Sequence, residues 1–211
     1  MGTEVLLYVP NIIGYVRLIL LVVAYFTFHS PSYFLAAYIV SATLDYFDGL
    51  FARKLGQTSA FGAWFDIVID NLGRGMLWCR MYEWGYFVAA TEWLVFVCTH
   101  TKGTDWKSAF AEAPPLVKGV MSAGFKSPLG FFAIAGIHVL PIWLYAHSSR
   151  FLAKAIGIPV AIDYLIIALL SSGRALCFLV ELFCLYTHIS YLLSQDTAES
   201  TKAKAATTQQ T

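Results

Sequence analysis

The sequence predicts an all-α integral membrane protein with six transmembrane helices and an N-terminal amphipathic segment. Of the 211 residues, 58% are hydrophobic and only 13% are charged, whereas a soluble globular domain has roughly 45–50% apolar and about 25% charged residues. The mean hydropathy is +0.65. One span needs about 20 apolar residues, so the chain is long enough for six spans joined by short loops.

Six apolar stretches follow one another along the chain. We expect spans at about residues 6–28, 33–50, 61–79, 86–100, 129–145 and 158–193. The first ends at the turn sequence His29-Ser30-Pro31-Ser32, and the second breaks near Gly56. The sixth is longer than a bilayer requires, or is broken near Gly173.

The polar segments set the expected domain organisation. Residues 101–128 are predicted to form a loop with interfacial structure. Residues 194–211 contain no large apolar side chain, so we expect a disordered cytosolic tail behind a membrane domain of residues 1–193. When loops are assigned alternately to the two faces, eight basic residues share the face of the termini, which predicts that this face is cytosolic. These residues are Arg53, Lys54, Lys102, Lys107, Lys118, Lys126, Lys202 and Lys204.

The overall charge argues against nucleic acid as a partner. The chain has 14 Lys and Arg against 13 Asp and Glu, a net charge of +1, and no basic block precedes the short tail. The cysteines lie singly within apolar stretches, so neither a zinc site nor a disulfide framework is indicated. The histidines are scattered near expected span ends, and we expect them at the interfaces.

Four aspartates interrupt the second and third apolar stretches: Asp45, Asp48, Asp66 and Asp70. A carboxylate in the middle of a span costs about 2.5–3.5 kcal/mol on insertion scales. Spacings of three and four place each pair on one helix face, and the short basic turn between the helices makes them antiparallel neighbours. We therefore expect the four carboxylates to converge. Oxygen ligands of this kind suit Mg²⁺ or Mn²⁺, and two facing pairs suit two ions.

Two other interpretations of the aspartates remain open. They could form buried structural ion pairs with Arg17, Arg53, Arg74 or Arg174, or line the path of a divalent-cation transporter. The remaining intramembrane or interfacial acids, Glu92, Asp163 and Glu181, are expected to pair with Arg174 or another cation.

Small residues separate the aspartate pairs. Gly49, Ala52 and Gly62 keep the lining small, so that backbone or a bulky ligand can approach closely. Arg53, five residues after Asp48, is placed to contact a phosphate with its planar guanidinium, although a basic flank of a span would look the same.

The complete pattern, Asp45-x2-Asp48-Gly49-x2-Ala52-Arg53-x8-Gly62-x3-Asp66-x3-Asp70, resembles the signature of the class I CDP-alcohol phosphatidyltransferases. Within that family the sequence is most similar to the eukaryotic phosphatidylinositol synthases. This closer resemblance rests on Val9-Pro10-Asn11-Ile12-Ile13-Gly14-Tyr15-x-Arg17, Leu44-Asp45-x-Phe47-Asp48-Gly49, Gln57 and Phe61-Gly62-Ala63.

The resemblance implies an enzyme that moves the phosphatidyl group of CDP-diacylglycerol to myo-inositol, giving phosphatidylinositol and CMP. It implies that Asp45, Asp48, Asp66 and Asp70 hold two divalent ions and that Asp70 also accepts the proton of the attacking hydroxyl. Positions Gly49, Ala52, Arg53, Ser59 and Gly62 would contact the CDP-lipid. The family also suggests a homodimer, and an endoplasmic reticulum membrane with the active site facing the cytosol.

The residues expected around the acceptor differ from the family pattern. Phosphatidylinositol synthases generally follow the last aspartate with Arg, whereas Asn71 stands here and the nearest cation on the helix is Arg74. Lys118 and Lys126 lie near positions where that family carries Arg, so we expect these two and Arg74 in the acceptor pocket. The same chemistry with glycerol phosphate or serine, or transfer from CDP-choline or CDP-ethanolamine to diacylglycerol, is the alternative.

Overall fold

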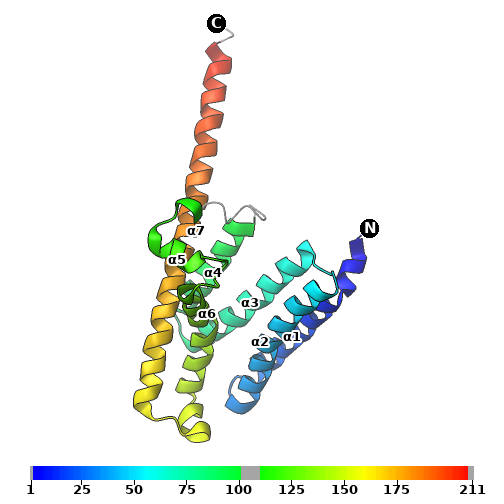
Figure 1. Cartoon of the computed structure of the whole chain (residues 1–211), viewed down its shortest axis with the longest axis vertical. Helices are drawn as coiled ribbons and strands as arrows, with labels where there is room; N and C mark the ends of the chain where they lie inside the picture. The colour runs from blue at the N-terminus through cyan, green and yellow to red at the C-terminus, as the bar shows by residue number, and fades with distance from the viewer. Residues whose placement is uncertain (1, 101–109, 209–211) are drawn as a thin grey trace. The chain divides into compact units, whose positions relative to one another are not determined.

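The computed structural model describes residues 2–100 and 110–208, and helices dominate this part of the chain (Figure 1). The all-α prediction is therefore confirmed. The elements in order are η1 (Gly2–Leu7), α1 (Val9–Phe26), α2 (Pro31–Lys54), α3 (Ala60–Met81), α4 (Gly85–His100), α5 (Pro115–Met121), α6 (Pro128–Ser148), η3 (Leu152–Ile156) and α7 (Val160–Thr208).

Local sequence explains the turn between α2 and α3. After α2 ends at Lys54, Gly56 adopts φ +64°, a conformation that residues with a Cβ rarely adopt. Ser59 then caps α3, because its Oγ accepts a hydrogen bond from the backbone N–H of Gly62 at 2.9 Å. The break expected near Gly56 is confirmed, and it leaves α2 and α3 as consecutive helices.

Six long helices, α1 to α4, α6 and α7, fall on the six apolar stretches, and four contain segments apolar enough to cross a membrane. These are Val9–Phe26, Pro31–Lys54, Pro128–Ser148 and Val160–Thr197. Of the other two, α4 has 16 residues, and α3 carries both Asp66 and Asp70 together with two arginines. Large apolar side chains face outward, such as Phe26 (78% exposed) and Phe131 (73% exposed), as expected of a lipid-facing surface. The chain is a multi-pass membrane protein.

The last helix is longer than expected. It runs without interruption through Gly173, so the alternative of a break there is wrong. It also continues to Thr208, into the predicted tail 194–211, where Ala, Glu, Lys and Gln are good helix formers. The separation of this tail from the membrane domain stays a prediction. In the polar segment before α6 the structure has the short helix α5, and the interfacial position of this segment stays a prediction. Lys102 and Lys107 lie outside the described residues.

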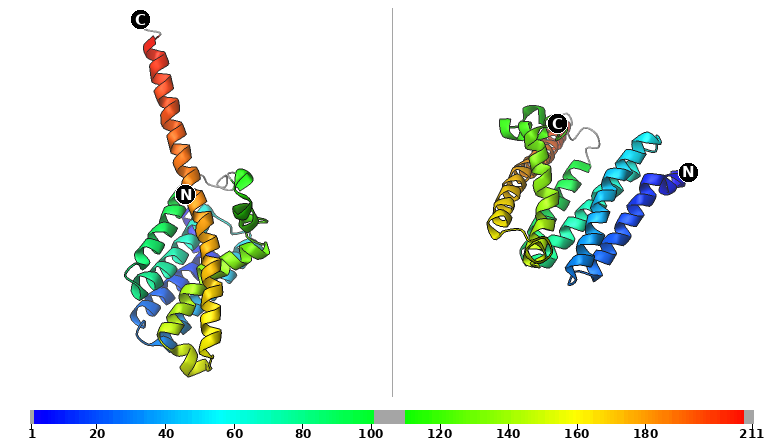
Figure 2. Two further views of the ribbon diagram at one scale, coloured as in Figure 1. Left: turned by 90° about the vertical axis from the view of Figure 1, so that its left-hand side faces the viewer. Right: turned by 60° about the horizontal axis from the view of Figure 1, so that its bottom comes forward.

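The chain divides into two compact units, Met1–Ala90 with Ile137–Ser171, and Thr91–Gly136 with Ser172–Thr211. In the first unit, α1 and α2 run side by side in opposite directions (Figure 2). Its apolar core gathers around Phe34, which is fully buried, with its ring centroid 4.0 Å from that of Tyr145 and 5.2 Å from that of Phe28. This core lies at the start of α2, which leaves the second half of α2 for the aspartates.

The second unit has its own packed interior. Val120 of α5 is 1% exposed, and the ring centroid of Phe110 lies 5.4 Å from that of Phe183 in α7. Helix α5 therefore belongs to a folded part of the chain rather than to a free loop.

Candidate active site

The four aspartates converge, as expected, and they do so around Arg17 of α1. The Nη1 atom of Arg17 lies 2.6 Å from Asp48 Oδ2 and 2.6 Å from Asp66 Oδ1. Its Nη2 atom lies 2.8 Å from Asp45 Oδ1 and 2.7 Å from Asp70 Oδ1. The Arg17 side chain is only 2% exposed. The alternative of buried ion pairs is therefore realised for Arg17, and the charge balance decides whether it suffices.

Arginine does not neutralise this cluster. The second guanidinium is that of Arg74, whose Nη1 lies 3.2 Å from Asp70 Oδ2. Four carboxylates against two guanidinium groups leave two negative charges in helices bounded by apolar surface. Such an excess is costly unless a cation balances it. The two uncompensated negative charges equal the charge of one divalent ion, so binding of such an ion would neutralise the cluster.

The donor set also fits a divalent ion. One oxygen from each of Asp45, Asp48 and Asp66 lies within 4.8 Å of the other two. The Asp45 and Asp66 side chains are 40% and 45% exposed, so an ion could reach them. Carboxylate oxygens are the ligands that Mg²⁺ and Mn²⁺ prefer. These residues could hold a divalent ion, and Asp70 faces the same guanidinium beside them.

A cavity of about 150 Å³ opens beside the cluster. It is lined by four of the five residues expected to contact a CDP-lipid, namely Gly49, Ala52, Ser59 and Gly62. The fifth, Arg53, packs against Gly49: a Cβ at Gly49 would lie 3.3 Å from Arg53 Nη1. A Cβ at Gly62 would lie 3.0 Å from Asn11 Oδ1. The two glycines therefore keep polar side chains close to the cavity without filling it.

Three polar residues that the sequence did not single out for a role also line this cavity: Asn11, Gln57 and Thr58. Gln57 Oε1 accepts a hydrogen bond from the backbone N–H of Val9 at 2.9 Å, which ties the turn before α3 to the start of α1. Asn11 is 2% exposed and donates to the carbonyl of Val5 at 2.5 Å. A buried amide inside an apolar stretch was the available signal for Asn11.

A second cavity, of about 170 Å³, is lined by Asp70, Arg74 and His138 together with Arg17, Tyr38 and Ser41. Ile69 lines both cavities, so they are neighbours. Arg74 Nη2 donates to Asn71 Oδ1 at 2.6 Å, and its Nη1 lies 3.5 Å from His138 Nδ1. The expected interfacial position of His138 is wrong, because α6 extends well beyond it on both sides.

The other two residues expected in an acceptor pocket belong to the second unit. Lys118 lies in the last turn of α5, and Lys126 lies in the turn before α6. Their part in such a pocket stays a prediction.

A second cluster of acids and arginine lies in the second unit. Arg174 Nη1 donates to Glu181 Oε2 at 2.9 Å, and its Nη2 lies 3.6 Å from Glu92 Oε1. The expected pairing of these two acids with Arg174 is confirmed. The remaining acid, Asp163, instead accepts from Trp143 Nε1 at 2.8 Å and lies 2.6 Å from His147 Nδ1.

The family model for CDP-alcohol phosphatidyltransferase matches residues 7–172 of the chain. The match covers both aspartate helices and both cavities. The chain belongs to the CDP-alcohol phosphatidyltransferase family.

Curated relatives give the comparison more detail. The chain is 42% identical over 77 residues to a CDP-diacylglycerol–inositol 3-phosphatidyltransferase of Schizosaccharomyces pombe, a match over 36% of this chain and 32% of the relative. It is 39% identical over 94 residues to the Saccharomyces cerevisiae protein of that name, over 44% and 40%. It is 40% identical over 69 residues to the Homo sapiens protein of that name, over 32% of each chain. The matches thus span between a third and two fifths of these relatives, and no solved structure matches.

Proposed function

We propose that the protein transfers the phosphatidyl group of CDP-diacylglycerol to myo-inositol, giving phosphatidylinositol and CMP. The observation that carries the proposal is the convergence of four carboxylates, two of them in excess over the arginines, between two neighbouring cavities. Similarity to inositol phosphatidyltransferases over 77 and 94 residues supports it.

The two cavities suit two substrates. The glycines of the first cavity leave space for the pyrophosphate of a CDP-lipid, and Arg53, which packs against Gly49, offers a planar cation beside it. The second, with Arg74 and His138, offers polar groups for an alcohol. Asp70 lines the second cavity while its oxygen also contacts Arg17 among the other aspartates. An alcohol in the second cavity would therefore meet Asp70, the one of the four aspartates that lines this cavity.

The proposed reaction is a single displacement at the phosphorus that carries the diacylglycerol group. The alcohol oxygen forms a bond to this phosphorus, the bond from phosphorus to the bridging oxygen breaks, and CMP leaves with that oxygen. Asp70 takes the hydroxyl proton, as a carboxylate within hydrogen-bond reach can. Arg74 holds the second oxygen of Asp70 and so fixes its orientation. Two Mg²⁺ or Mn²⁺ ions held by Asp45, Asp48, Asp66 and Asp70 would supply positive charge to the phosphate oxygens.

Arg74 also bears on the choice of acceptor. The phosphatidylinositol synthases generally carry Arg directly after the last aspartate, where this chain has Asn71. Here Arg74 reaches back one turn, contacts Asp70 and is held by Asn71 Oδ1. A guanidinium is thus present beside Asp70 although the sequence position differs, which supports a polyol such as inositol as the acceptor.

The cellular setting completes the proposal. We infer six membrane spans, with α3 and α4 joining the four apolar helices, and an amphipathic N-terminal segment at η1. The basic residues of the connections favour a cytosolic active site in the endoplasmic reticulum membrane. A homodimer is proposed from the family.

The test is an assay of the purified protein with labelled CDP-diacylglycerol, Mg²⁺ or Mn²⁺ and one alcohol at a time. We expect CMP release and a labelled lipid product that both depend on inositol. CMP release that is indifferent to inositol but responds to glycerol phosphate or serine would reassign the acceptor. Absence of CMP release with every alcohol would overturn the proposed function.

A further inference from the structure

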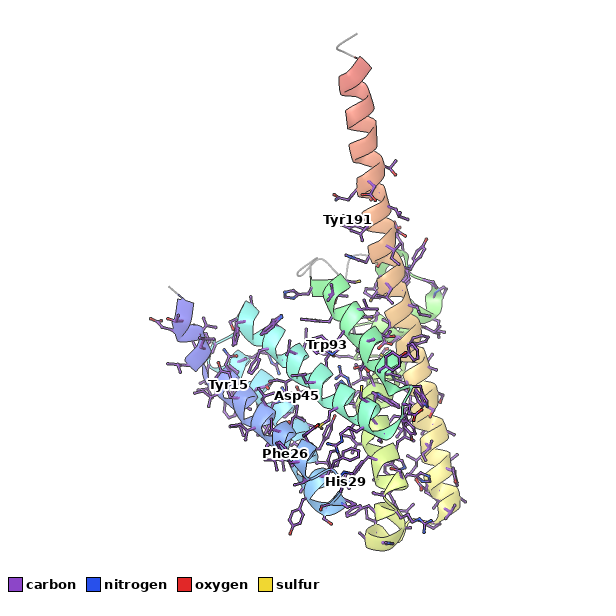
Figure 3. All side chains as sticks on the ribbon, turned by 180° about the vertical axis from the view of Figure 1, so that it is seen from behind. Tyr15, Phe26, His29, Asp45, Trp93 and Tyr191 are labelled. Carbon is purple, nitrogen blue, oxygen red and sulfur yellow. The ribbon has the colours of Figure 1, made fainter. Side chains whose placement is uncertain are left out.

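A third cavity, of about 420 Å³, lies in the first unit at the opposite end of α2 from the aspartates. Its lining comes from the turn after α1, the start of α2, and the ends of α3 and α6. It includes Phe28, His29, Arg80, Tyr82, Ser148 and Ser149. Fourteen residues of α2 separate Pro31 from Asp45, which corresponds to about 21 Å along a helix. Figure 3 shows Phe26 and His29 at this end and Asp45 away from it. The cavity is therefore separate from the proposed active site.

Arg80 is held rigidly in the wall of this cavity. Its guanidinium carbon lies 4.6 Å from the ring centroid of Tyr25 and 4.4 Å from that of Phe28, and its Nη1 donates to the carbonyl of Tyr25 at 2.8 Å. Contacts of this kind fix the plane of the guanidinium. A cation with a fixed planar fork is suited to binding an oxyanion through two parallel hydrogen bonds.

Arg80 has no carboxylate partner in residues 2–100 and 110–208. The ion pairs of arginine among these residues involve Arg17, Arg74 and Arg174 instead, and the aromatic rings beside Arg80 carry no full negative charge. Most of the five N–H donors of Arg80 are therefore left for solvent or a ligand. Next to Arg80, burial raises the pKa of Tyr82, so its phenol stays protonated and can donate a hydrogen bond.

The surroundings of the cavity indicate its depth in the membrane. The apolar helix α1 ends here at Phe26, and α2 begins at Pro31. Exposed aromatic side chains gather at the same end, with Tyr25 50%, Phe26 78%, Tyr33 71% and Trp84 52% exposed. Aromatic residues of this kind mark the layer of lipid headgroups. The oxyanion available at that depth is the phosphate of a phospholipid.

We propose that this cavity binds the phosphodiester headgroup of a membrane phospholipid through Arg80. A cavity of 420 Å³ is within the range of about 300–1,000 Å³ usual for ligand pockets, and it opens where acyl chains can remain among the exposed aromatic residues. The site does not depend on the proposed reaction, because it shares no lining residue with the two cavities beside the aspartates.

The test measures lipid binding to the delipidated full chain in detergent by native mass spectrometry. The probes are dioctanoylphosphatidylglycerol, inorganic phosphate and dioctanoylglycerol, which carries no phosphate. We expect the wild type to bind the phospholipid, and neither phosphate nor dioctanoylglycerol at the same concentration. Arg80→Met should weaken phospholipid binding at least tenfold, whereas Arg150→Met, at an exposed arginine outside the cavity lining, should leave it unchanged.

Two further variants keep the test decisive. Ser149→Trp fills the cavity but keeps Arg80, and it should weaken phospholipid binding as Arg80→Met does. It therefore tests the proposal independently if Arg80→Met folds poorly. Asp48→Ala alters the proposed active site and should not change phospholipid binding in this assay. Equal binding to Arg80→Met, Ser149→Trp and wild type would overturn the proposal. Binding of inorganic phosphate as tight as that of the phospholipid would overturn the lipid as its ligand.

Discussion

Two clusters in this protein combine buried arginine with carboxylates from different helices, but they differ in exposure and in charge. Around Arg17, four aspartates outnumber the guanidinium groups by two, and Asp45 and Asp66 are 40% and 45% exposed. Around Arg174, Glu92 and Glu181 are only 3% and 6% exposed. The closed cluster can hold helices together, whereas the open cluster can exchange a ligand. Composition alone would not separate them.

The largest effect is expected from removing the proposed base. Asp70→Asn keeps the shape of the side chain but cannot accept the hydroxyl proton, so inositol-dependent CMP release should fall roughly 10²- to 10⁴-fold. Binding of the CDP-lipid should be partly retained. The measurement is single-turnover CMP release alongside equilibrium binding of the nucleotide lipid.

The matched control is the same change in the closed cluster, Glu181→Gln. This variant should keep inositol-dependent CMP release close to that of the wild type once it is purified in folded form. Near-normal turnover in Asp70→Asn, or an equal loss in both variants, would contradict the division of the two clusters into catalytic and structural.

Removing the cation of the closed cluster should mainly affect stability. Arg174→Met leaves Glu92 and Glu181 buried without their common partner, and breaking a buried ion pair in this way typically costs about 3–5 kcal/mol. Denaturant unfolding in detergent measures this cost. Mn²⁺ binding by the folded fraction should not change. A selective loss of Mn²⁺ binding would mean that the metal site lies at Arg174 and not at the four aspartates.

Removing the cation of the open cluster should strengthen metal binding. Arg17→Met removes the positive charge that the four aspartates share. Unit charges about 4 Å apart interact strongly even at an effective dielectric of about 20. The affinity for Mn²⁺ in the absence of nucleotide should therefore rise at least about tenfold. The metal-free variant should melt at a lower temperature than the wild type, and Mn²⁺ should restore the difference. Unchanged affinity and melting would show that Arg17 does not compete with a metal ion.

A smaller effect is expected at the acceptor cavity. Arg74→Lys keeps the charge but loses the planar fork that contacts both Asp70 and Asn71. We expect KM for inositol to rise roughly three- to tenfold, about the loss of one hydrogen bond, with KM for CDP-diacylglycerol unchanged. Arg150→Lys, at an exposed arginine outside the lining of the three cavities, is the matched control. A rise in KM for CDP-diacylglycerol alone would assign Arg74 to the donor.

Local sequence rules predicted much of this architecture. Helical spacing placed Asp45 with Asp48 and Asp66 with Asp70, and Gly56 with the cap at Ser59 determined the turn that lets the pairs meet. The six apolar stretches predicted six helices, although the charges within α3 keep it from qualifying as an apolar span by composition. These features depend on neighbours within a few residues, which the sequence displays directly.

Long-range contacts were not predictable in the same way. Arg17 lies 31 residues before Asp48 and 53 before Asp70, so the sequence could name it as a partner but not as the common partner of all four aspartates. His138 approaches Arg74 across 64 residues, and nothing local marks it. The helical continuation to Thr208 was not predicted because this segment has no large apolar side chain to pack, although many of its residues favour a helix.

The most direct test of the central claim is a Mn²⁺ titration of the purified chain, followed by electron paramagnetic resonance of free and bound ion. We predict two bound ions per chain in the wild type and in Glu181→Gln, with magnetic coupling between ions about 3.5–4 Å apart. Binding should be at least tenfold weaker in Asp48→Ala. A wild type that retains no Mn²⁺, or an equal loss in Glu181→Gln and Asp48→Ala, would contradict it.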